Sequence, residues 1–135
     1  MRREFIIDGS NFSDIEGFYC EIDKLLTKDL SWKTGHNLDA FNDLLRGGFG
    51  VHEYNEPIIL KWINYKKSLS DFGYEATAQY YEKMRTRCHP TCVLDVENLL
   101  NNAKNKKGDT LMAIIVGIIL DKNNSGHDCE LVTID

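Results

Sequence analysis

Three short apolar segments, separated by long stretches with helical character, restrict the fold of this chain more than any other feature. They span residues 3–8, 57–63 and 130–134, and polar or turn-forming residues bound each of them. Strands that are joined by long helical crossovers pair in parallel, with right-handed connections. We therefore expect an α/β fold, a small three-layer-like domain with a three-stranded parallel sheet flanked by helices. The mostly apolar middle segment is typical of a central strand.

The stretches between these strands predict several helices. Ser13 is a suitable N-cap for a helix that runs to about Lys28. Further helices are expected over residues 38–46, 64–72, 74–87, 93–106 and 110–120. Residues 110–120 are so apolar that periodicity does not separate helix from strand, and Asp109 as a cap favours a helix. With 135 residues, 42% of them hydrophobic, the chain is long enough to form one domain, residues 1–135, without disulfides or metals.

Residues 37–47 predict a short helix with two unlike faces. Asn37 is a suitable N-cap, and Gly47 or Gly48 can end the helix in a left-handed conformation. Four apolar side chains share one face at helical spacing, namely Leu38, Phe41, Leu44 and Leu45. The opposite face carries Asp39, Asn42, Asp43 and Arg46. Two carboxylates four residues apart repel each other, so this pair suggests a cationic partner outside the chain.

The distribution of charge argues about partners. The chain has a net charge of −5, and the segment from position 8 to 56 carries ten acidic residues against four basic ones. Acidic surface excludes direct nucleic-acid binding and favours a basic partner. The longest apolar run, residues 111–120, has about half the length that a membrane span needs, and the N-terminus carries no signal peptide. We therefore expect a cytoplasmic protein with reduced cysteines and no membrane partner.

The surroundings of this predicted helix favour a binding site. Trp32 and Lys33 lie on the preceding loop, and glycines follow the helix. Aromatic and charged residues on loops beside a rigid helix are typical of a protein-binding surface. The alternative is a solvent-exposed helix face without a function, because such faces carry acidic residues routinely.

At these residues the chain resembles the barstar family, the small cytosolic inhibitors of barnase-type ribonucleases. The likeness is carried by residues 35–47, in which the run 37–40, Asp43, Leu45 and Gly47 fit the family pattern. Residues 57–62 are similar to the second strand of the family, and residues 7–9 fit its opening. The resemblance extends over about residues 4–66 and includes the closing strand.

This resemblance implies a non-enzymatic inhibitor, an immunity protein or antitoxin, that plugs the active site of a basic nuclease or toxin. A nuclease that binds phosphate presents basic side chains, and a carboxylate on a rigid helix takes the place of the phosphate. Asp43 matches the dominant acidic contact of the family, and Asp39 matches a second one. The implied binding surface comprises Trp32, Lys33, Gly35, His36, Asp39, Asn42, Asp43, Arg46 and Gly47. No cofactor is expected.

The chain also departs from the best-known members of the family. Asn42 stands where they have an aromatic residue, Arg46 where they have a small hydroxyl residue, and Lys33-Thr34 where they have two tyrosines. The acidic contact on their last helix falls within residues 118–122, where this chain has no glutamate. Arg46 and Lys33 would repel a purely basic cleft, so we expect a target toxin with its own acidic group there. Residues 73–108 look like an inserted helical segment.

Two cysteines and a histidine form a second candidate site. Cys88, His89 and Cys92 lie close together in the sequence, with His127 and Cys129 far downstream. Zinc accepts such ligands, but paired zinc sites usually show a Cys-x-x-Cys spacing, and the spacing here is irregular. Thiols in a loop and in the core are the alternative interpretation.

The end of the first strand offers an enzymatic alternative. Residues 6–11 resemble the first-strand end of PIN-like and NYN-type nucleases, in which an aspartate, here Asp8, binds a metal. Such enzymes gather three or four acidic residues, for which Asp39 or Asp43, Asp71 and Asp135 are the candidates. The alternative reading of Asp8 is a simple Asp-Gly turn after a strand. A third hypothesis is an interaction module that keeps the fold but does not bind a nuclease.

Overall fold

A computed structural model describes residues 2–27, 36–121 and 127–135. Three strands form one parallel sheet: β1 (Arg3–Asp8), β2 (Ile58–Ile63) and β3 (Cys129–Thr133). The strand order is β1-β2-β3, with Ile7 opposite Trp62 and Trp62 opposite Thr133. The expected α/β class, the parallel sheet and the central position of the second strand are confirmed.

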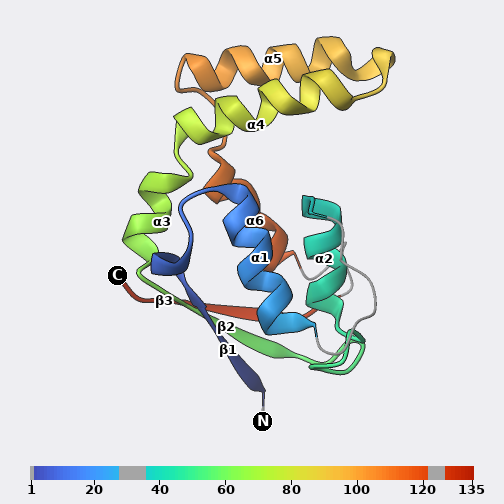
Figure 1. Cartoon of the computed structure of the whole chain (residues 1–135), viewed down its shortest axis with the longest axis vertical. Coiled ribbons are helices and arrows are strands. Elements are labelled where there is room, and N and C mark those ends of the chain that lie inside the picture. The colour runs from blue at the N-terminus through green and yellow to red at the C-terminus, as the bar shows by residue number, and fades with distance from the viewer. Residues whose placement is uncertain (1, 28–35, 122–126) are drawn as a thin grey trace.

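The helices cover one face of this sheet (Figure 1). On β2 the side chains of Ile58, Leu60 and Trp62 are fully buried, whereas the alternate side chains are half-buried. On the same open face Ile6 of β1 is 49% exposed and Val132 of β3 is 38% exposed. The structure therefore has two layers, which corrects the expectation of a three-layer-like arrangement: charged residues on the open face replace the second helical layer, as the ion pair of Glu4 with Lys61 at 3.7 Å shows.

The helices follow the predicted order with small shifts at their ends. The α-helices are α1 (Ile15–Leu26), α2 (Leu38–Arg46), α3 (Tyr65–Asp71), α4 (Tyr74–Arg87), α5 (Val93–Lys104) and α6 (Leu111–Leu120), and two 3₁₀ turns are η1 (Gly9–Asn11) and η2 (Pro90–Cys92). Helix α1 ends before Lys28 because Thr27 forms an antiparallel bridge with Gly50.

Two of the predicted N-caps are wrong by one residue. Asp14, not Ser13, caps α1 by accepting a hydrogen bond from the backbone N–H of Gly17 at 2.8 Å. Thr110, not Asp109, caps α6 by accepting from the N–H of Ala113 at 3.1 Å. A cap side chain reaches the N–H group three residues ahead, so the first helical residue decides which neighbour serves.

The main core lies between the sheet and the helices that cover it. Trp62 is fully buried, stacks on Phe18 of α1 with ring centroids 5.5 Å apart, and donates from Nε1 to Ser68 Oγ of α3 at 3.0 Å. Phe41 of α2 meets the edge of Phe18 at 5.1 Å. From α6, Leu111, Met112, Ile115 and Ile119 complete this core. The indole of Trp62 therefore ties three segments that are far apart in the sequence.

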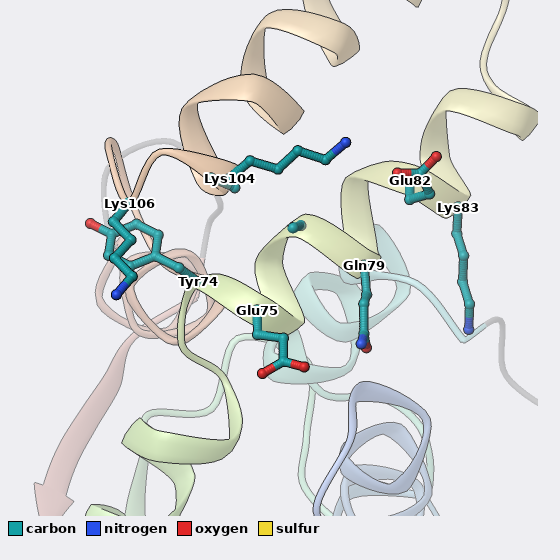
Figure 2. A pocket seen from close by; sticks show the side chains of 9 residues that line it. Tyr74, Glu75, Gln79, Glu82, Lys83, Lys104 and Lys106 are labelled. Carbon is teal, nitrogen blue, oxygen red and sulfur yellow. The ribbon is translucent and has the colours of Figure 1, made fainter.

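Helices α4 and α5 form a hairpin that stands off from the sheet (Figure 1). They share a small separate core of Tyr81, Val96, Leu100 and Ala103. Figure 2 shows an open groove of about 630 Å³ between them, along which charged side chains such as Glu75, Lys83 and Lys104 lie. This hairpin occupies the segment that we expected to be an insertion, residues 73–108.

Candidate functional site

Helix α2 has fixed ends on both sides. The Oδ1 atom of Asn37 accepts from the N–H of Ala40 at 2.7 Å, as predicted. At the other end Gly47 has a φ of 88°, and a Cβ atom there would lie 2.2 Å from the carbonyl oxygen of Glu53. Only glycine fits this position, because a side chain would collide with backbone that has no room to move. The cap and the stop therefore define a rigid helix of nine residues.

The two faces of α2 are divided as the sequence predicts. Phe41, Leu44 and Leu45 are buried in the main core, and Leu38 packs against it. Asp39 and Asp43 point away from that core and are exposed. These two carboxylates are therefore available to a partner molecule.

Asp43 and Arg46 lie beside each other on the exposed face. The Asp43 side chain is 61% exposed, and its carboxylate lies 3.7 Å from Nη1 of Arg46, which is 33% exposed. An exposed ion pair at this distance contributes little to stability, since water screens it. A partner that binds Asp43 therefore competes with a weak contact.

Asn42 turns toward the interior of the protein. Its Oδ1 atom lies 3.0 Å from Nε2 of His127, which is 3% exposed and precedes β3. Burial lowers the pKa of His127, and the nearby charge of Arg46 lowers it further. The sequence interpretation placed Asn42 on the binding surface and weighed His127 only as a metal ligand. The structure assigns both to one contact that joins α2 to the chain before β3.

His36 joins the start of α2 to α1. Its Nδ1 lies 2.9 Å from a carboxylate oxygen of Glu16, and its Nε2 lies 3.1 Å from one of Asp23. The hydrogen bond to Glu16 is the main cause that raises the pKa of His36, and Asp23 adds to it against the effect of burial. We predicted His36 as a partner contact. The structure shows it in two ion pairs within the chain, with 30% of its side chain exposed.

The loop after α2 folds back under the end of the helix. The buried ring of His52 places Nε2 at 3.2 Å from the carbonyl oxygen of Leu45. The N–H of Gly48 donates to the carbonyl of His52 at 2.8 Å, and the N–H of Asn55 donates to that of Arg46 at 2.6 Å. These bonds satisfy carbonyl groups that a helix end leaves free. The predicted role of Gly47 is therefore structural at least in part.

Three of the predicted contact residues, Trp32, Lys33 and Gly35, lie outside the described residues. Their place on the surface stays a prediction.

Helix α4 brings further side chains near the start of α2. A cleft of about 620 Å³ has Tyr19 and His36 on one side and Tyr80, Lys83 and Arg87 of α4 on another. Burial raises the pKa of the Tyr80 phenol, and the charge of a carboxylate of α2, that of Asp39, adds to this effect. Nothing local in the sequence indicated that α4 approaches α2, because the approach depends on how the hairpin is mounted.

The enzymatic candidate Asp8 lies in a capped turn at the end of β1. Its Oδ1 atom accepts from the N–H and the hydroxyl of Ser10 at 2.9 and 2.7 Å and from Nδ2 of Asn64 at 2.8 Å. These hydrogen bonds lower the pKa of Asp8. Glu21 is the acidic neighbour of this turn and accepts from the N–H of Asp8 at 3.2 Å. The geometry is that of a turn that joins β1 to the start of α3.

The cysteine and histidine candidates do not come together. Cys88, His89 and Cys92 lie at the turn between α4 and α5, whereas His127 and Cys129 lie beside the sheet (Figure 1). Nδ1 of His89 is 2.8 Å from the hydroxyl of Thr91. In the described part of the chain, no group of three or more His, Cys, Asp or Glu side chains is arranged to hold a metal ion.

The comparisons with known proteins add one finding. The family model described as Barstar (barnase inhibitor) matches residues 2–94, which include β1, α1, α2, β2, α3 and α4. The comparison with curated proteins gives no match. Among the described helices, none is long and apolar enough to cross a membrane.

Proposed function

Because this chain belongs to the barstar family of barnase inhibitors, we propose that it blocks the active site of a ribonuclease-type toxin with the exposed face of α2. The observation that carries this proposal is the position of Asp39 and Asp43. Both are exposed on a helix whose cap, stop and buried face are all fixed. Such a helix can present two carboxylates without losing conformational freedom on binding, which is a large cost in most interfaces.

The charge of the site supports a basic target. A ribonuclease binds the phosphates of RNA with basic side chains, and carboxylates form strong hydrogen bonds to the same groups. Asp39 and Asp43 therefore occupy the place of RNA phosphates in this proposal. The protein itself neither binds RNA nor cleaves it. As an antitoxin or immunity protein it acts in the cytoplasm, where such a nuclease meets cellular RNA.

Arg46 narrows the choice of target. It lies on the face of α2 that carries Asp43, at 3.7 Å from the Asp43 carboxylate. A uniformly basic cleft would be repelled by this guanidinium, so we propose that the cognate nuclease carries an acidic group opposite Arg46. Barnase itself lacks this support from the sequence and serves as a first probe of the site.

Inhibition of a barnase-type ribonuclease tests the proposal. We expect Asp43→Ala to weaken binding by at least about 30-fold, the effect of about 2 kcal/mol that defines an interface hot spot in general, barstar among the examples, and not a value derived from this structure. The control is Asp95→Ala, an exposed aspartate in the first turn of α5, which should leave affinity unchanged. If the two variants bind equally, α2 is not the binding surface. The association rate should also fall with added salt, because charge steers the encounter.

An RNase assay with the protein alone separates inhibition from catalysis. We expect no cleavage of RNA with Mg²⁺ or Mn²⁺ present. Cleavage that disappears in Asp8→Ala would instead establish the metal-dependent nuclease. Capture of a partner other than a nuclease from the native cell, together with failure to inhibit any barnase-type enzyme, would establish the interaction module.

A further inference from the structure

Three of the four histidines of this chain hold α2, each at a different point along the helix. His36 ties its beginning to α1, His127 contacts its middle, and His52 contacts its last turn. The carboxylates proposed to bind a nuclease, Asp39 and Asp43, lie between these points of attachment. The position of the acidic face therefore depends on imidazole rings, which gain or lose a proton near neutral pH.

We propose that His36 and His127 are positioning residues for the acidic face of α2, and that they hold it only in opposite protonation states. Both act through the helix and not by touching the partner. The inference rests on the proposed function in one respect, because its consequence is the affinity for a nuclease. The attachment of α2 itself can be tested on the free protein.

His36 holds the helix as a charged imidazolium. Each of its ring nitrogens faces a carboxylate oxygen, of Glu16 and of Asp23, and a ring donates two hydrogen bonds only when both nitrogens carry a proton. These two carboxylates of α1 raise its pKa above the ordinary value, Glu16 most. The other neighbour from α1 is the ring of Tyr19, with centroids 5.5 Å apart. Loss of the proton removes one of the two bonds to α1.

His127 holds the helix as a neutral ring. Burial is the main cause that lowers its pKa, and Arg46 of α2 acts in the same direction. Asp121, Asp128 and the carbonyl of Ile118 favour the charged ring, but their combined effect is smaller. Nδ1 is buried without a hydrogen-bond partner among the described residues, so a second proton there would be poorly placed. Uptake of a proton therefore disturbs the contact with α2.

The two requirements are met together in a limited pH window. The window lies between the lowered pKa of His127 and the raised pKa of His36, and it contains the ordinary histidine value of about 6.5. Below the window His127 becomes charged and loosens the middle of α2. Above it His36 becomes neutral and loosens the beginning. The affinity for a nuclease is then bell-shaped in pH, with a fall on each side of about fivefold or more, the lower end of typical coupling between sites.

An NMR titration of the free protein tests the attachment directly. We expect the ring of His36 to titrate above pH 6.5 and that of His127 below it, and the backbone amides of Asp39 and Asp43 to shift at both transitions. His89, an exposed histidine at the far end of the hairpin, should titrate without affecting these amides. If the amides of Asp39 and Asp43 follow neither ring, the proposal is wrong.

Variants identify the source of each fall in affinity. His127→Gln keeps a polar group opposite Asn42 but does not titrate, so the fall on the acid side should disappear. His36→Gln should remove the fall on the alkaline side, and the control His89→Gln should keep both. The probe is a barnase-type ribonuclease, whose own groups also titrate, so a fall in affinity counts only if it disappears in one variant.

The outcomes separate this inference from the proposed function. If no nuclease binds at any pH, the proposed function fails, and the titration of the free protein still decides on the histidines. If a nuclease binds and both falls persist in both variants, the histidines are not positioning residues, although inhibition stands. Should His127→Gln not fold, Asn42→Ala removes the same contact from the side of α2, and the acid-side shift of the Asp43 amide should disappear.

Discussion

The body of the molecule, meaning the sheet with α1, α2, α3 and α6, and the α4–α5 hairpin are held together in different ways. In the body, fully buried Trp62 of β2 contacts Phe12, Phe18 and Tyr65, which come from distant parts of the chain. The hairpin core consists of four side chains from two adjacent helices. The body therefore forms only when the whole chain folds, whereas the hairpin depends on local contacts.

A few polar contacts join the hairpin to the body. Thr77 of α4 is fully buried, and its Oγ1 accepts from the N–H of Leu111 at 2.6 Å and donates to the carbonyl of Gly73 at 2.8 Å. The hydroxyl of Tyr74 donates to the carbonyl of Gly108 at 2.8 Å. Ala76 and Tyr80 also pack against the main core. The comparison teaches that the two regions share a joint and not a common core, so they can be destabilised separately.

The largest effect is expected in the body. Trp62→Ala should lower the free energy of unfolding by about 3–5 kcal/mol, because it removes the largest fully buried side chain and its hydrogen bond to Ser68. Denaturant unfolding measures this value. Tyr54→Ala is the control, since Tyr54 is 66% exposed and should change stability by less than about 0.5 kcal/mol. A small effect of Trp62→Ala would contradict the central place of β2.

A smaller and local effect is expected in the hairpin. Leu100 is 2% exposed, and Leu100→Ala should cost about 2 kcal/mol, at the low end for such a change because the small core can collapse around the gap. Hydrogen exchange should show lost protection in α4 and α5 but not in β2. Leu99→Ala, at a neighbouring position that is 43% exposed, is the control. Equal loss of protection in β2 would show that the two regions unfold together.

The joint is expected to have an intermediate to small effect. Thr77→Val keeps the shape of the side chain but leaves the N–H of Leu111 without an acceptor, which should cost about 1–2 kcal/mol. Thr86→Val is the matched control on the same helix, because the Thr86 hydroxyl bonds only an exposed carbonyl. Thermal unfolding of both variants compares them. No difference between them would mean that the joint rests on apolar contacts alone.

The smallest effect is expected at the start of α2. Asn37→Ala removes the cap and should lower stability by about 1 kcal/mol, whereas Asn37→Asp keeps an acceptor and should cost less. The thermal midpoint measures this difference. The position of Asp39 in the first turn should also be less fixed, so nuclease affinity should fall in Asn37→Ala. Unchanged affinity would show that a frayed first turn is tolerated at the interface.

Local chemistry allowed much of this fold to be predicted. Asn37 and Gly47 bound α2 correctly because capping and a left-handed stop depend on neighbouring residues only. The apolar strands predicted the parallel sheet because long crossovers leave few alternatives. The N-caps of α1 and α6 were wrong by one residue because Ser13 and Asp14, like Asp109 and Thr110, are both able to cap, and packing decides where the helix begins.

Long-range contacts could not be predicted in the same way. Asn42 and His127 lie 85 residues apart, and no local pattern relates them. The sheet was expected to be covered on both faces because its strands are rich in isoleucine. Charged residues on alternate positions, Glu4 and Lys61, were the signal for an open face. Whether Trp32, Lys33 and Gly35 belong to the binding surface and whether the hairpin is an insertion stay predictions.

The place of the hairpin between β2 and β3 also bears on how fast the chain folds. Closing a long loop costs chain entropy before the strands at its ends can pair. Helices α4 and α5 pair locally and so draw together the ends of the segment that separates β2 from β3. The effective loop is shorter than the sequence distance, and a weakened hairpin should slow the arrival of β3 at the sheet.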